Sequence, residues 1–173
     1  MWIIFAFGSA IFAGITSILA KCGIKKTDSN VATAIRTVVV LIFAWVMVFI
    51  VKSQSSISEI NLKTWVFLIL SGISTGASWL CYFRALQLGE INKVVPVDKS
   101  STALTIILSL IFLGEKLTWA KAAGTAAITV GTLLMIHKAK GGKRESSDGR
   151  WLLYAVFSAL FASLTSIFGK IGI

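Results

Sequence analysis

The sequence predicts an all-α, polytopic membrane helix bundle: five transmembrane helices and a sixth that begins an inverted repeat. Three observations lead to this class. The 173 residues are 56% hydrophobic and 14% charged, with a mean hydropathy of +0.86, too apolar for a soluble domain. Apolar blocks of about 20 residues, the length a helix needs to cross a bilayer, occur repeatedly. The beginning of the chain is also repeated near its end.

Polar connectors divide the apolar blocks into segments. Helices are expected over residues 2–20, 31–51, 65–83, from a first turn at Pro96 to Leu113, over 119–136, and from 151 onward. The run Thr27-Asp28-Ser29-Asn30 offers N-cap side chains to the second helix, and residues 84–92 are expected to form a short turn. Residues 138–150 are rich in glycine, serine and charge, which is typical of a flexible linker. The predicted units are therefore 1–137, the linker 138–150, and 151–173.

The second unit is predicted from an internal repeat at an offset of 149 residues. The identical pairs are Trp2/Trp151, Ala6/Ala155, Ser9/Ser158, Ala10/Ala159, Phe12/Phe161, Ala13/Ala162, Thr16/Thr165, Ser17/Ser166, Ile18/Ile167, Lys21/Lys170, Gly23/Gly172 and Ile24/Ile173. Matched tryptophan, lysine and glycine positions do not follow from apolar composition alone. Because a unit of five spans is odd, its second copy must enter the membrane from the opposite face, as in inverted-repeat transporters.

One polar face follows the expected fourth helix. Asp98, Ser101, Thr102, Thr105 and Ser109 recur at helical spacing in an apolar run. An ionised group within a bilayer costs about 2.5–3.5 kcal/mol, so such groups normally face a bundle interior, a partner or a wet cavity. The pattern predicts the wall of a polar path.

Asp98 has two expected uses. It is the best candidate for proton coupling, because loss of water favours the protonated form of a carboxyl group. A structural ion pair with Lys99 or with Arg36 is the alternative. Arg36 itself either reaches the membrane surface or turns inward as a partner for Asp98 or for an anionic solute.

Trp79 and Tyr82 are two further candidates for the path. Both are broad, flat side chains with a polar group at one end, and both lie in the expected third helix. Core packing or a place in the aromatic belt at the membrane surface is the alternative interpretation.

The remaining composition argues against several classes of protein. The net charge of +10 is spread between the apolar blocks, which favours loop flanking over a nucleic-acid surface. Cys22 and Cys81 lack CxxC spacing, and His137 is the single histidine, so the sequence indicates no metal site, no cofactor and no enzyme.

The distribution of basic residues predicts the orientation in the membrane. The odd-numbered connectors between the expected helices carry ten basic residues, and the opposite side of the membrane carries five. Because basic residues are enriched in cytoplasmic loops, this count favours a cytoplasmic position for the odd-numbered connectors.

Several motifs together resemble the EamA family of the drug/metabolite transporter superfamily. They are Asp28-Ser29-Asn30, Ala34-Ile35-Arg36-Thr37, the run from Gly76 to Leu86, the run from Lys93 to Ser101, and Leu113-Gly114-Glu115. The resemblance covers residues 1 to 140 as one five-span unit and 151 to 173 as the start of another. It implies ten spans in two inverted halves, or paired five-span proteins, around a central cavity. It also implies a cytoplasmic N-terminus, the reverse of the charge count.

The sequence thus favours a multi-pass protein of the cell membrane that transports small metabolites or drugs by alternating access. The expected partners are the lipid bilayer, a small-molecule solute, and a homo- or heterodimeric subunit or missing second half, without nucleic acid. The alternative is a non-transporting membrane subunit that packs against another membrane protein.

Overall fold

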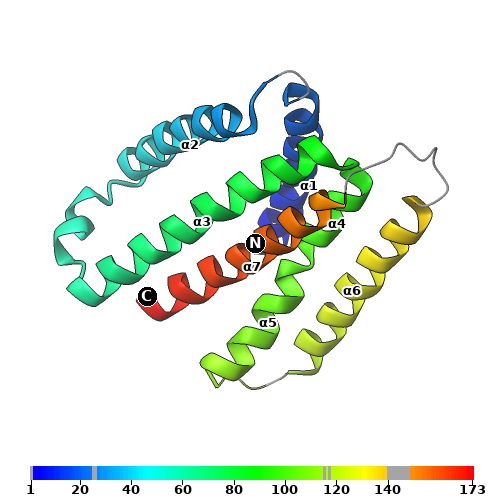
Figure 1. Cartoon of the computed structure of the whole chain (residues 1–173). Helices are drawn as coiled ribbons and strands as arrows, with labels where there is room; N and C mark the ends of the chain where they lie inside the picture. The colour runs from blue at the N-terminus through cyan, green and yellow to red at the C-terminus, as the bar shows by residue number, and fades with distance from the viewer. Residues whose placement is uncertain (1, 25–26, 115, 117, 140–148) are drawn as a thin grey trace.

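The computed structural model describes residues 2–24, 27–114, 116, 118–139 and 149–173, and these residues form helices and their connections without a strand (Figure 1). The elements are α1 (Trp2–Gly23), α2 (Ser29–Val51), the short 3-10 helix η1 (Gln54–Glu59), α3 (Leu62–Leu88), α4 (Ile91–Lys99), α5 (Ser101–Phe112), α6 (Trp119–Ala139) and α7 (Arg150–Gly172). The predicted all-α class is confirmed. Most of the linker expected over 138–150 lies outside the described residues, as does the side chain of His137.

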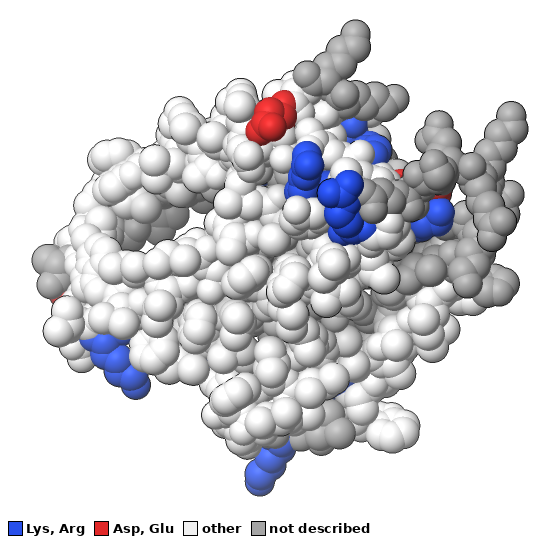
Figure 2. All heavy atoms as spheres, in the orientation of Figure 1, with Lys and Arg blue, Asp and Glu red and all other residues white. Residues whose placement is uncertain are grey.

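Five spans in the described part of the chain are long and apolar enough to cross a membrane: α1, α2, α3, α4 together with α5, and α7. The face seen in Figure 2 is uncharged along the helix sides, and its lysine and arginine side chains lie toward the helix ends. Nearly all side chains of α1 and α2 are exposed although they are apolar. Such a surface is stable in lipid and unstable in water, so the chain is a multi-pass membrane protein.

The centre of the structure is built around α7, which lies along α3 and also contacts α4 and α5 (Figure 1). The exposed fractions of Ala155, Ser158 and Ala159 are 0%, 0% and 5%. Small side chains allow two helices to approach closely, and lipid provides no hydrophobic drive to replace that packing. The first helix of the expected second unit therefore forms part of the core of the first unit.

The expected turn over 84–92 is wrong in its length. α3 continues to Leu88 and α4 begins at Ile91, so the turn consists of Gly89 and Glu90. The Lys21 ammonium group stabilises the longer helix, because it donates hydrogen bonds to the carbonyl oxygens of Leu86 and, at 2.7 Å, Gly89. These are carbonyl groups that a helix end leaves without an intrahelical partner.

The expected single helix from Pro96 to Leu113 is interrupted at Ser100, and Pro96 lies inside α4 instead of in a first turn. The Ser100 hydroxyl donates to the Val97 carbonyl oxygen at 2.6 Å. Its backbone N–H is shared between the carbonyl oxygens of Pro96 and Val97, at 3.0 and 3.3 Å. Asp98 therefore belongs to α4, and the hydroxyl residues of the predicted polar face belong to α5.

The predicted N-cap of the second helix is confirmed at Asp28. One carboxylate oxygen accepts hydrogen bonds from the backbone N–H groups of Asn30 and Val31, at 2.8 and 3.4 Å. We expect Asp28→Ala to lower the free energy of unfolding by about 1 kcal/mol, because these N–H groups lose their acceptor. Thermal unfolding in one detergent would measure the effect. Asp28→Asn keeps an acceptor oxygen and should remain close to wild type; equal losses in both variants would contradict the cap.

Candidate solute site

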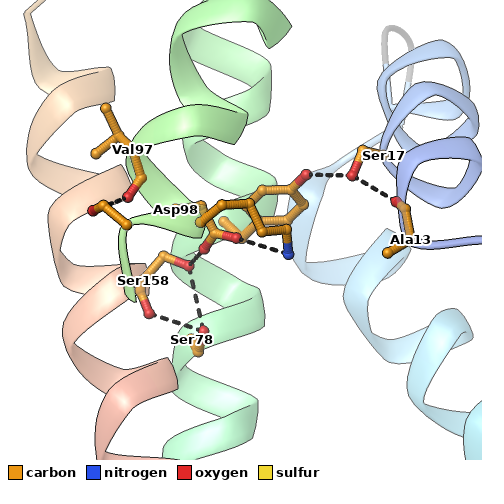
Figure 3. Close-up of polar contacts among 9 residues, drawn as sticks. Ala13, Ser17, Ser78, Val97, Asp98 and Ser158 are labelled. Atoms are coloured by element: carbon orange, nitrogen blue, oxygen red, sulfur yellow. Dashed lines mark hydrogen bonds and ion pairs between the residues drawn. The ribbon is translucent and has the colours of Figure 1, made fainter. Parts of the chain in front are cut away.

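Asp98, on α4, is surrounded by protein groups. Its exposed fraction is 8%, and its Oδ1 accepts a hydrogen bond from Ser158 Oγ on α7 at 2.6 Å (Figure 3). Lys99 Nζ lies 3.4 Å from Oδ2. A charge at membrane depth thus has a hydrogen-bond donor on one oxygen and a cation near the other, which offsets part of its lost hydration.

A second serine extends this contact to α3. Ser78 Oγ donates to the Ser158 carbonyl oxygen at 3.0 Å, and the two hydroxyl oxygens lie 3.3 Å apart (Figure 3). Ser78 and Ser158 are both buried. The Ser78–Ser158–Asp98 contact therefore joins three helices from distant parts of the sequence.

A cavity of about 110 Å³ adjoins the Asp98 carboxylate. Its lining residues are Ser78, Trp79, Tyr82, Asp98, Lys99, Ser101 and Ala162. Since a water molecule occupies about 30 Å³ and drug-sized ligands need about 300 Å³ or more, this volume suits a few waters or a small ion. A larger solute requires the helices around the cavity to separate.

Tyr82 and Trp79 form an aromatic wall of this cavity. Their ring centroids are 5.4 Å apart with planes at 84°, an edge-to-face arrangement. The Tyr82 hydroxyl donates to Ser17 Oγ at 3.1 Å, and Ser17 donates to the Ala13 carbonyl oxygen at 3.0 Å (Figure 3). These bonds connect the wall to α1.

The structure brings together five of the predicted site residues and leaves three outside the cavity. Asp98, Lys99, Ser101, Trp79 and Tyr82 line it, whereas Thr102, Thr105 and Arg36 do not. Thr102 is exposed, and Thr105 Oγ1 donates to the Ser101 carbonyl oxygen at 2.8 Å. Arg36 lies against Trp79, with its Cζ 3.3 Å from a ring centroid. The described ion pair of Asp98 is with Lys99.

Ser158 and Ser78 are site residues that the sequence prediction did not include, and Ser158 is the one bonded to Asp98. Its one sequence signal is the match to Ser9 in the internal repeat, which reports a shared helix pattern and no contact. The Ser158 hydroxyl group reaches Asp98, and Ser78 reaches Ser158, only because α7 packs along α3 and α4.

Residues 1–137 match the EamA-like transporter family, and this match covers most of the chain. The chain belongs to the EamA-like transporter family. An uncharacterized transporter from the cobO 3′ region of Sinorhizobium sp. is 46% identical over 134 residues, which are 78% of the EamA protein described here and 95% of the relative. The uncharacterized transporter YvbV of Bacillus subtilis is 26% identical over 141 residues, 82% of this chain and 46% of the relative. No solved structure matches the chain significantly.

Membership of this family identifies the EamA protein as a membrane transporter. The two relatives differ in how much of their own length the alignment covers. The alignment includes nearly all of the Sinorhizobium protein but less than half of the Bacillus protein.

Proposed function

We propose that this EamA protein moves a small solute across the bilayer by alternating access, and that the Asp98 cavity lies on the route. The observation that carries the proposal is a carboxylate held inside the bundle beside a cavity with hydroxyl, aromatic and ammonium groups in its wall. Burial of an ionisable group at this depth is costly and is typical of a substrate or ion pathway. In this mechanism Asp98 binds the solute or a coupling proton, and Trp79 and Tyr82 contact the solute from the side. Thr102 and Thr105 would join the route only when the helices around the cavity separate.

A second five-helix unit would complete the route, with 1–137 as the first unit, 138–150 as the linker and 151–173 as the start of the second. The comparison between α1 and α7 supports this arrangement. Ala6, Ser9 and Ala10 on α1 are exposed, whereas the identical residues at the matching positions of α7 are almost fully buried against the first unit. By the symmetry of the repeat, a second unit would cover Ala6, Ser9 and Ala10 of α1 as the first unit covers their matches on α7. The second unit would come from the same polypeptide or from a separate subunit.

Flux through reconstituted vesicles tests the proposal. We expect vesicles that contain the whole chain to take up at least one member of a pool of isotope-labelled metabolites faster than empty vesicles. Absence of flux for every metabolite in the pool would favour the non-transporting subunit instead.

Ala6→Leu tests the second unit in the same assay. Overpacking of a helix contact costs about 1–3 kcal/mol, so we expect assembly and flux to fall fivefold or more. Ala44→Leu is the matched control, because Ala44 is also an exposed alanine, on α2. Equal flux in both variants would contradict a partner that covers the small residues of α1.

A further inference from the structure

Arg36 is the one charged residue in the sequence of α2. In the described part of the chain, its contact is with the Trp79 ring, and no carboxylate forms an ion pair with it. A guanidinium group has five N–H donors, and stacking on a ring face leaves the donors at its edge available. Arg36 is therefore a fixed cation in a membrane helix without an anionic partner from the described residues.

Arg36 lines a groove of about 390 Å³. It lies between α1, α2 and the last turns of α3, and apart from two threonines and Arg36 its wall is apolar. Leu19 and Ala20 line it from α1, Ile24 from the residue after α1, Ala32 and Ile35 from α2, and Phe83 from α3. The groove can hold a hydrocarbon chain, with the guanidinium group in its wall.

The groove also lies at the depth of the membrane surface. Its α1 residues belong to the last two turns of that helix, its α2 residues to the first two turns, and Phe83 is close to the end of α3. Figure 1 shows the end of α1 and the start of α2 at the same end of the molecule as the end of α3. At about 1.5 Å per residue, Arg36 is roughly 10 Å along α2 from Ser29, a distance that a long arginine side chain can largely span.

We propose that this groove binds an anionic phospholipid, with its phosphate on the Arg36 guanidinium group and one acyl chain along α1 and α2. Arginine matches phosphate with paired N–H donors, and basic pockets between transmembrane helices suit anionic headgroups. The Trp79 ring holds the guanidinium group in place on one side and lines the Asp98 cavity. The lipid site is thus separate from the proposed solute site and does not depend on transport activity.

Native mass spectrometry of the whole chain, released from detergent with added lipid, tests the site. The probes are phosphatidylglycerol, phosphatidylcholine of the same chain length, and inorganic phosphate. We expect wild type to retain phosphatidylglycerol in preference to phosphatidylcholine. Arg36→Gln should weaken phosphatidylglycerol binding about tenfold or more, since it removes a charge-assisted hydrogen bond. Arg84→Gln is the matched control: Arg84 is exposed near the same end of the bundle, bonded to Gln87, and outside the groove.

Ala20→Phe provides a second variant that keeps the arginine and fills the groove. It should also weaken phosphatidylglycerol binding, and the melting temperature of each variant shows whether the fold is retained. Equal retention of the two lipids by wild type, or an unchanged preference in folded Arg36→Gln, would overturn the proposal. Displacement of phosphatidylglycerol by millimolar inorganic phosphate would show a free-anion site and would overturn the assignment to lipid.

Discussion

An Asp98→Asn chain should carry its solute at least about tenfold more slowly than wild type in vesicles, the ratio expected when a charge-assisted hydrogen bond is lost. Asparagine has nearly the same size as aspartate, and its side-chain oxygen can still accept the hydrogen bond from Ser158. The fold should therefore persist, and the change should act on the charge that we propose binds the solute or a coupling proton. Initial rates of uptake at several solute concentrations would measure it.

Two neighbouring variants distinguish the charge from the local packing. Asp98→Glu keeps the carboxylate and should retain more flux than Asp98→Asn. Lys99→Gln should have a small effect on stability, because 54% of the Lys99 side chain is exposed and such ion pairs contribute about 0–1 kcal/mol. Flux in Asp98→Asn equal to wild type would remove Asp98 from the mechanism.

Ala155→Leu should destabilise the chain by about 1–3 kcal/mol or more, the range found when a well-packed contact is overfilled. Ala155 has an exposed fraction of 0% and belongs to the core cluster with Leu86 and Val94. A leucine there adds three carbon atoms that can fit only if α7 moves away from α3. That movement would also separate Ser158 from Asp98. Thermal unfolding in a single detergent, followed by circular dichroism, would measure the loss.

The internal repeat provides a matched control for this prediction. Ala6 occupies the same position in α1 as Ala155 in α7, but it is exposed. Ala6→Leu should therefore change the stability of the isolated chain by no more than about 0.5 kcal/mol, as at most surface positions. Similar losses in the two variants would contradict the central packing of α7.

The two variants also separate stability from assembly. Ala155→Leu should lower both the unfolding temperature and flux, because it disturbs the unit itself. Ala6→Leu should lower flux alone if a second unit covers α1.

The helix boundaries show what local sequence could predict. Asp28 is an N-cap because its own carboxylate reaches the N–H groups of the residues two and three positions later, and this geometry needs no other part of the fold. The end of α3 was missed because its last carbonyl groups are bound by Lys21, which is 65 residues from Leu86 in the sequence. A long-range contact of this kind leaves no local pattern.

The candidate site was likewise predictable only in part from local sequence. The spacing of Asp98, Ser101, Thr102 and Thr105 on an ideal helix placed all four on one face. The helix is interrupted at Ser100, and of the four residues only Asp98 and Ser101 line the cavity. Trp79 and Tyr82 could be proposed from their side-chain chemistry, but their position in the wall depends on the contact between α3, α4 and α1.

The sequence by itself predicted a multi-pass helical membrane protein, because apolar blocks of spanning length and capping residues are local or compositional signals, and its short motifs showed the resemblance to the EamA family. Only the tertiary structure decided that α7 packs along α3, that Ser158 bonds to both Asp98 and Ser78, and that Arg36 turns to Trp79 and an apolar groove. The physical reason is that these contacts join residues far apart in the chain. In a membrane they depend on the fit between helix surfaces, which hydropathy does not encode.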